Sequence, residues 1–108
     1  MFQLQKHDEP MKWPVKVYIP RPGGTNTKAT FMAHFMLKTQ DEADVLSQGS
    51  DQDFMEAVLV GWDAAKDEEG NELPFSEEAR QKMVNIPYVK TALVAAYFEC
   101  IVGGPRKN

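Results

Sequence analysis

Residues 29–37 read ATFMAHFML, and this stretch decides the class of fold. Every second side chain in it is apolar: Ala29, Phe31, Ala33, Phe35 and Leu37. The positions between them are Thr30, Met32, His34 and Met36. A period of two with aromatic residues on one side is typical of a β-strand. The stretch therefore predicts a strand whose two faces differ in character.

Residues 13–19, WPVKVYI, repeat the same period, with Trp13, Val15, Val17 and Ile19 on one side. The segment 20–27 between the two runs is PRPGGTNT, which is rich in turn residues. The two runs therefore predict an antiparallel hairpin with a long, mobile loop. Pro14 lacks an N–H, which favours an edge position for the first strand. MFQLQ at residues 1–5 could add a short third strand through Phe2 and Leu4.

After Leu37 the pattern becomes helical. Thr39 with Glu42 three residues later predicts a capping box for a short helix ending near Gln48. Ser50 or Asp51 is expected to cap a second helix. Its apolar side chains recur at helical spacing: Phe54, Met55, Val58, Leu59 and Trp62.

Two further helices are predicted. Ser76 is expected to cap a third helix, with Glu77 and Glu78 near its positive end. The fourth helix is expected from Pro87 to Val102, because proline suits a first helical position and Gly103-Gly104 suits a C-cap. The expected fold is a single α+β domain over residues 1–108. It has a β-hairpin at about 11–38, a bundle of about four helices at 39–103 and a basic tail at 104–108.

Composition and charge restrict the function. The chain has 108 residues, 43% of them hydrophobic and 26% charged, as in an ordinary soluble domain. Residues 1–38 and 80–108 each carry a net charge of +4, whereas residues 39–79 carry −12. This acidic middle segment argues against nucleic-acid binding and could attract copies of the chain or a basic partner.

Targeting signals are not evident in the sequence. The first ten residues lack the pattern of a signal peptide, and the apolar run from Ala92 to Val102 contains Glu99 and is too short to cross a bilayer. The single cysteine, Cys100, lies within this run and is expected to be an inert core thiol in a reducing, cytoplasmic compartment.

The acidic segment 61–75, GWDAAKDEEGNELPF, is the densest group of potential metal ligands and catalytic carboxylates in the sequence. An EF-hand loop with Gly70 at its sixth position would place Ala65 first and Ser76 last, which removes both terminal ligands. The carboxylates lie in a polar turn, where no apolar pocket raises a pKa. The segment therefore predicts a tight turn, with Trp62 and Phe75 packed at its base.

Other candidate reactive groups are isolated. His7 and His34 lack metal-ligand spacing, and Gly23-Gly24 is not followed by the residues of a phosphate-binding loop. The sequence predicts no catalytic residue, no metal site and no cofactor. A binding protein is therefore favoured over an enzyme.

Two features predict assembly. The fourth helix is apolar on nearly every side, which indicates either complete internal burial or a self-association surface. An isolated hairpin exposes edges that another chain can pair with. We expect partner contacts or self-association at six residues: Trp62, Phe75, Tyr88, Leu93, Tyr97 and Phe98.

Residues 58–108 resemble the tail assembly chaperones of long-tailed bacteriophages. The resemblance rests on the Gly-Trp pair at 61–62, the acidic DEEGN turn at 67–71 and Pro-Phe-Ser at 74–76. It continues through a Pro-started, alanine-rich helix to Gly-Gly and basic residues. The segment ATFMAHF at 29–35 also resembles the hairpin of this family, so the similarity extends from about Met11.

The resemblance implies a non-enzymatic protein of the host cytoplasm, absent from the mature virion. Its partners would be the tape measure protein, which it coats, and the tail tube protein, to which it delivers that cargo. A ribosomal frameshift near Arg106-Lys107-Asn108 would yield a longer form. A structural tail or connector subunit of the virion is the alternative, and a small metal-dependent enzyme is a third hypothesis.

Overall fold

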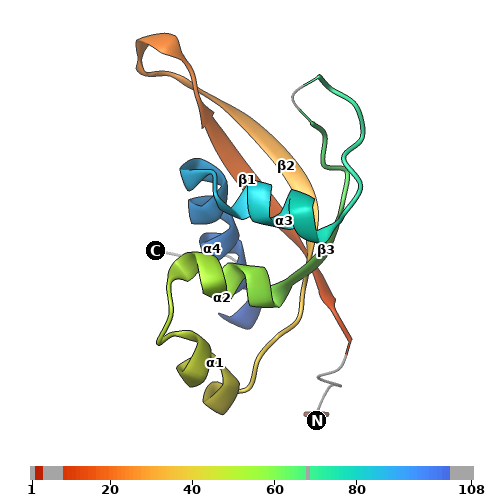
Figure 1. Ribbon diagram of the computed structural model, residues 1–108, viewed down its shortest axis with the longest axis vertical. Coiled ribbons are helices and arrows are strands. Elements are labelled where there is room, and N and C mark those ends of the chain that lie inside the picture. The colour runs from red at the N-terminus through yellow and green to blue at the C-terminus, as the bar shows by residue number, and fades with distance from the viewer. Residues whose placement is uncertain (1, 4–8, 68, 103–108) are drawn as a thin grey trace.

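A computed structural model, which describes residues 2–3, 9–67 and 69–102, shows an α+β fold (Figure 1). The strands are β1 (Met11–Pro20), β2 (Asn26–Phe35) and β3 (Leu59–Asp63). The helices are α1 (Gln40–Leu46), α2 (Asp51–Val58), α3 (Glu77–Val84) and α4 (Pro87–Val102). The strands form one antiparallel sheet in the order β1-β2-β3. The predicted fold class is confirmed, with one more strand than the hairpin provides.

The hairpin has the register that the alternating pattern predicts. Met11 of β1 lies opposite Phe35, and Pro20 lies opposite Asn26. The side chains on the predicted apolar face form much of the core: Val15, Val17, Phe31, Ala33 and Phe35. Among the described residues, no helix covers the opposite face of this pair, and most of its side chains are exposed. This arrangement explains why polar residues alternate with apolar ones along both strands.

The loop of the hairpin is shorter than the segment 20–27 suggested. A single 3₁₀ turn, Pro22–Gly24, joins the strands. Gly23 has φ 86° and Gly24 has φ 84°, both in the left-handed region that glycine adopts without strain. The N–H of Arg21 donates to the carbonyl of Thr25 at 2.9 Å, which closes the turn.

Strand β3 corrects the prediction that a single helix carries Val58, Leu59 and Trp62. Helix α2 ends at Val58, and the chain then pairs with β2 through Leu59–Asp63. Helical spacing misled the prediction because β3 contains a bulge. Ala33 lies opposite Trp62 and Phe35 opposite Leu59, so one extra residue is accommodated between them. The bulge turns both side chains towards the core although they are three positions apart.

Gly61 is required in β3 for a steric reason. It lies opposite His34, and a Cβ atom at residue 61 would stand 2.7 Å from Nδ1 of that ring. The third strand expected at the N-terminus is not observed where it can be checked. Phe2 lies in no strand, and Leu4 falls outside the described residues. Gly103-Gly104 and the basic tail at 104–108 also fall outside them.

The helix starts follow the predicted capping residues. Thr39 and Glu42 form a capping box at α1, and Ser50 forms another with Asp53 at α2. The hydroxyl of Ser76 accepts the N–H of Ala79 at 3.0 Å and so caps α3. Helix α1 contributes no buried residue and lies at the edge of the core. Helix α4 packs against β1 and beneath α2 and α3.

Candidate functional site

Helix α4 has two different sides, although its sequence is apolar all round. One side is buried and consists of Val89, Ala92, Leu93, Ala96, Tyr97 and Cys100. Leu93 is fully inaccessible, and Tyr97 is 1% exposed. The Tyr97 ring packs edge-on against Phe35 and Phe54, and its hydroxyl accepts the N–H of Lys38 at 3.2 Å. Leu93 and Tyr97, both predicted association residues, therefore belong to the core of the domain.

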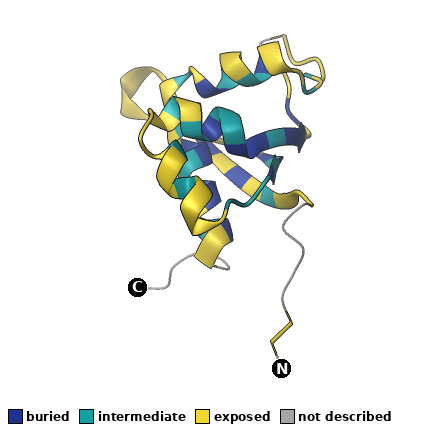
Figure 2. Cartoon of the chain, turned by 60° about the horizontal axis from the view of Figure 1, so that its bottom comes forward, coloured by how far each residue is buried: buried dark blue, intermediate teal, exposed yellow. Residues whose placement is uncertain are grey.

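The other side of α4 is exposed to solvent. Its residues recur with alternating spacings of three and four: Tyr88, Thr91, Ala95, Phe98 and Val102. We call this set the α4 face. Phe98 is 58% exposed and Val102 55%, and the neighbouring Ile101 is similarly exposed. The face from Tyr88 to Val102 is about 21 Å long, given a rise of about 1.5 Å per residue. Figure 2 shows α4, next to the C-terminus, divided between buried and exposed segments.

A hollow of about 490 Å³ borders the α4 face on the side of α1. Its apolar lining consists of Leu37, Ala43, Phe54, Tyr97, Phe98 and Ile101, and its polar lining of Lys38, Gln40, Asp44 and Ser47. Phe98 also lines two smaller hollows, beside α2 and beside Val102. Phe98 thus forms an apolar ridge with a depression on each side. This shape suits a partner that inserts side chains beside the ridge.

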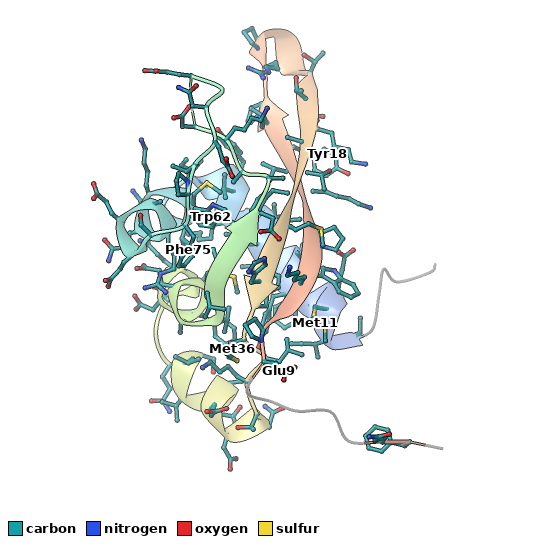
Figure 3. The ribbon with its side chains drawn as sticks, turned by 90° about the vertical axis from the view of Figure 1, so that its right-hand side faces the viewer. Glu9, Met11, Tyr18, Met36, Trp62 and Phe75 are labelled. Carbon is teal, nitrogen blue, oxygen red and sulfur yellow. The ribbon has the colours of Figure 1, made fainter. Side chains whose placement is uncertain are left out.

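Trp62 and Phe75 do pack together, as the sequence predicts (Figure 3). Their ring centroids are 4.8 Å apart, and the indole N–H of Trp62 donates to the carbonyl of Leu73 at 2.8 Å. Both residues belong to the interior rather than to a free surface, because Trp62 is 6% exposed and Phe75 packs against the core. Their role is to fix the base of the acidic loop.

The acidic loop is a turn stabilised by one of its own carboxylates. Lys66 and Glu72 form an isolated β-bridge. The carboxylate of Asp67 accepts the N–H groups of Glu69 and Asn71, both at 2.9 Å. Gly70, with φ 84°, supplies the left-handed position that the turn needs. Within the described part of the chain, no group of three or more His, Cys, Asp or Glu side chains could hold a metal ion.

The exposed face of the sheet carries a small polar cluster. Nε2 of His34 lies 2.9 Å from a carboxylate oxygen of Asp63, and Nζ of Lys12 lies 3.7 Å from the same oxygen. The hydrogen bond from His34, together with the positive charges of His34 and Lys12, lowers the pKa of Asp63 below its ordinary value despite slight desolvation. The cluster lies on an open sheet surface, and its three residues come from β1, β2 and β3. It therefore links the three strands.

Asp63 gives a testable pH dependence. Because its pKa is lower in the folded chain than in the unfolded chain, it contributes stability above about pH 4 and loses that contribution as the pH falls through the folded-state value. Urea unfolding at pH 7 and pH 3 should therefore show native protein more stable than Asp63→Asn at pH 7, with a smaller difference at pH 3. An equal difference at both values would contradict this account.

The remaining titratable groups inside the core are not activated. Burial raises the pKa of the Cys100 thiol, so the reactive thiolate is scarce at neutral pH. Burial is also the main reason that the pKa of Tyr97 is raised. Both groups act as apolar packing elements.

Comparison with known proteins adds no constraint, because no family model, curated protein or solved structure matches the chain. Across the described residues, none of the helices combines the length and apolar character needed to cross a bilayer. The strongest candidate site is therefore the α4 face with its adjoining hollow. Tyr88 and Phe98 of this site were predicted from the sequence, whereas Ile101 and Val102 were not. At about 100° per residue, Val102 lies 180° from Leu93 but Ile101 only 80° from it, so even with Leu93 known to be buried, helical spacing assigns only Val102 to the exposed side.

Proposed function

We propose that this protein is a non-enzymatic tail assembly chaperone that holds apolar helical segments of a phage tape measure protein on its α4 face. The observation that carries the proposal is the exposed 3-4 spacing of Tyr88, Thr91, Ala95, Phe98 and Val102. Four of these five side chains are apolar or aromatic, and such side chains at this spacing form the seam by which one helix packs on another. The resemblance of residues 58–108 to such chaperones supplies the identity of the partner.

The physical reason for such a chaperone lies in its client. A long apolar helix in water tends to aggregate, because its exposed surface is stabilised by any other apolar surface. The α4 face and the 490 Å³ hollow offer such a surface next to polar groups of α1. The acidic residues 39–79, with a net charge of −12, would keep the complex soluble by mutual repulsion. In this proposal the complex forms in the host cytoplasm and passes its cargo to the tail tube protein.

Phe98→Asp is the variant that tests this proposal. The substitution places a charge at the centre of the α4 face, where a bound helix would have to desolvate it. We expect binding to the tape measure protein to weaken by at least tenfold, measured by co-purification and by titration with a tape measure segment. The thermal midpoint should change little, because Phe98 is already largely exposed.

Val45→Asp is the matched control. Val45 is an equally solvent-accessible apolar residue, 66% exposed, but it lies on α1 outside the residues that line the hollow. Native affinity in this variant, with lost affinity in Phe98→Asp, would support the α4 face. Equal affinity in both would refute it.

Virion composition separates the proposal from its alternative. A chaperone acts during assembly and should be absent from purified particles. A structural tail or connector subunit should be present in fixed stoichiometry. Detection of the chain in mature virions by mass spectrometry would therefore favour the structural role.

A further inference from the structure

The outer part of the hairpin stands beyond the helices. Residues 20–30 are exposed without exception, and Figure 1 shows this end of the hairpin rising past α3 and α4. We call residues 20–30 the arm. An exposed two-stranded ribbon is only marginally stable by itself, because neither of its faces is fully covered. The arm therefore gains stability if a second surface packs against it.

One edge of the arm is open for backbone pairing. Strand β3 pairs only with Met32–Phe35, so among the described residues no strand lies beside residues 26–31 of β2 on the side away from β1. The chain leaves the sheet at Ala64, whose φ of 65° turns it away into the acidic loop. The free edge is thus created by the point at which β3 ends.

The backbone groups on this edge point outward. The N–H of Met36 donates to the carbonyl of Val58, on the β3 side of β2. Because N–H direction alternates along a strand, the N–H groups of Lys28 and Thr30 point to the same side. In the segment without β3, these groups have no partner strand on that side among the described residues.

The opposite edge of the hairpin is protected against pairing. Pro14 lies opposite Met32, and Pro20 lies opposite Asn26. In these pairs the backbone groups point away from the partner strand, so each proline removes an N–H from the outer edge of β1. Lys12 and Lys16 add charge to the same edge. Proline and lysine are the usual means by which proteins block edge pairing, and residues 26–31 of β2 contain no proline and one lysine.

A groove of about 610 Å³ lies beside the open edge. Its apolar lining includes Ile19, Ala29, Phe31, Met83 and Ile86. Arg21 of the arm lines one part of it and Asp67 of the acidic loop another. The chain has no acidic residue between Pro10 and Gln40, and the arm carries Arg21 and Lys28. The loop beyond Asp67 carries Glu69 and Glu72, so arm and loop have opposite charges.

We propose that a second copy of the chain occupies this groove, with the open edges of the two β2 strands paired antiparallel about a two-fold axis. Each arm then fills the groove of the other copy and brings its basic side chains to that copy's acidic loop. Antiparallel pairing of identical edges satisfies a two-fold axis, because each copy offers and receives the same groups. Tyr88, at one end of the α4 face, also lines this groove, but Thr91, Ala95, Phe98 and Val102 do not. Most of the α4 face therefore remains free in this dimer, and the inference does not depend on the proposed function.

The decisive experiment compares Lys28→Pro with Lys28→Gln. Both variants remove the same positive charge, but only proline removes the outward N–H on the open edge. The internal ladder with β1 should persist in both, which circular dichroism and thermal unfolding will check. Sedimentation velocity should show a dimer dissociation constant at least tenfold larger for Lys28→Pro than for Lys28→Gln, since the symmetric interface loses a hydrogen bond in each copy.

Lys16→Pro is the positional control, because Lys16 lies on β1 and its backbone faces the protected edge. It should dimerise like the native chain, apart from the loss of one charge. If Lys16→Pro weakened dimerisation as much as Lys28→Pro does, the assignment of the dimer interface to the β2 edge would be wrong. Equal dissociation constants for Lys28→Pro and Lys28→Gln would overturn the strand pairing.

Amide hydrogen exchange on the native chain tests the same idea without a substitution. Exchange at Lys28 should slow as the protein concentration rises through the dissociation constant, because pairing protects its N–H. A chain that sediments as a monomer at all concentrations would refute the proposal. So would a dimer in which the Lys28 amide exchanges as fast as in the monomer.

Discussion

Leu93→Asp is expected to abolish folding. Leu93 is fully inaccessible at the centre of the buried side of α4. The substitution removes a leucine side chain worth about 2–5 kcal/mol and adds an unpaired buried carboxylate worth several more. Small domains are stable by only about 5–15 kcal/mol, so the sum is of the same order as the whole free energy of unfolding. Far-UV circular dichroism should show loss of the cooperative thermal transition.

Leu93→Met is the control for this variant. Methionine preserves volume and apolar character, and such exchanges usually change stability by less than about 1.5 kcal/mol. It should therefore keep the native transition and a midpoint within a few degrees. A cooperative transition near the native midpoint in Leu93→Asp would show that residue 93 is accessible, contrary to the packing described above.

Trp62→Ala should produce the second-largest effect, a loss of about 3–5 kcal/mol in the free energy of unfolding. The Trp62 ring packs edge-on against Phe31 and Phe75, and its N–H donates a hydrogen bond to the carbonyl of Leu73. The alanine variant loses these ring contacts and leaves a cavity between β3 and the acidic loop. Urea unfolding monitored by circular dichroism will measure the change.

The same variant should also release the acidic loop. Without the indole, the return segment at Leu73 loses one of its anchors and keeps the backbone contacts of residues 65–73 and the packing of Leu73 on the core. Limited proteolysis with a glutamate-specific protease should then cut faster at Glu69 or Glu72. Trp62→Phe retains most of the packing but not the hydrogen bond. Its cleavage rate should therefore lie between those of the native protein and Trp62→Ala. Unchanged cleavage in Trp62→Ala would argue against the anchoring role.

The candidate site was predictable only in part. Phe98 and Tyr88 were expected to meet a partner, and both lie on the exposed α4 face. Leu93 and Tyr97 were expected there too, but the structure places them in the core. The sequence could not distinguish the exposed pair from the buried pair. Helix α4 is apolar on nearly all sides, so no polar stripe identifies its solvent-facing side. The placement of β1 and of Phe35 and Phe54 decides which side is covered.

The open edge of β2 could not be predicted from the sequence either. Whether residues 26–31 have a strand beside them depends on where β3 lies and where it ends. Local spacing predicted that Leu59 and Trp62 belonged to a helix, since a bulge in a strand can reproduce a helical interval. Only the pairing of Ala33 with Trp62 and of Phe35 with Leu59 reveals the strand.

Features that depend on neighbouring residues in the chain could be predicted without the structure. Alternation from Trp13 to Ile19 and from Ala29 to Phe35 specified the hairpin, and Thr39, Ser50 and Ser76 specified three helix starts. Strand alternation and capping bonds span only two to four residues, so short motifs encode them. The third strand, the exposed side of α4 and the open edge of β2 depend on contacts between segments far apart. Only the tertiary structure decides them, because burial is settled by which surfaces meet in space.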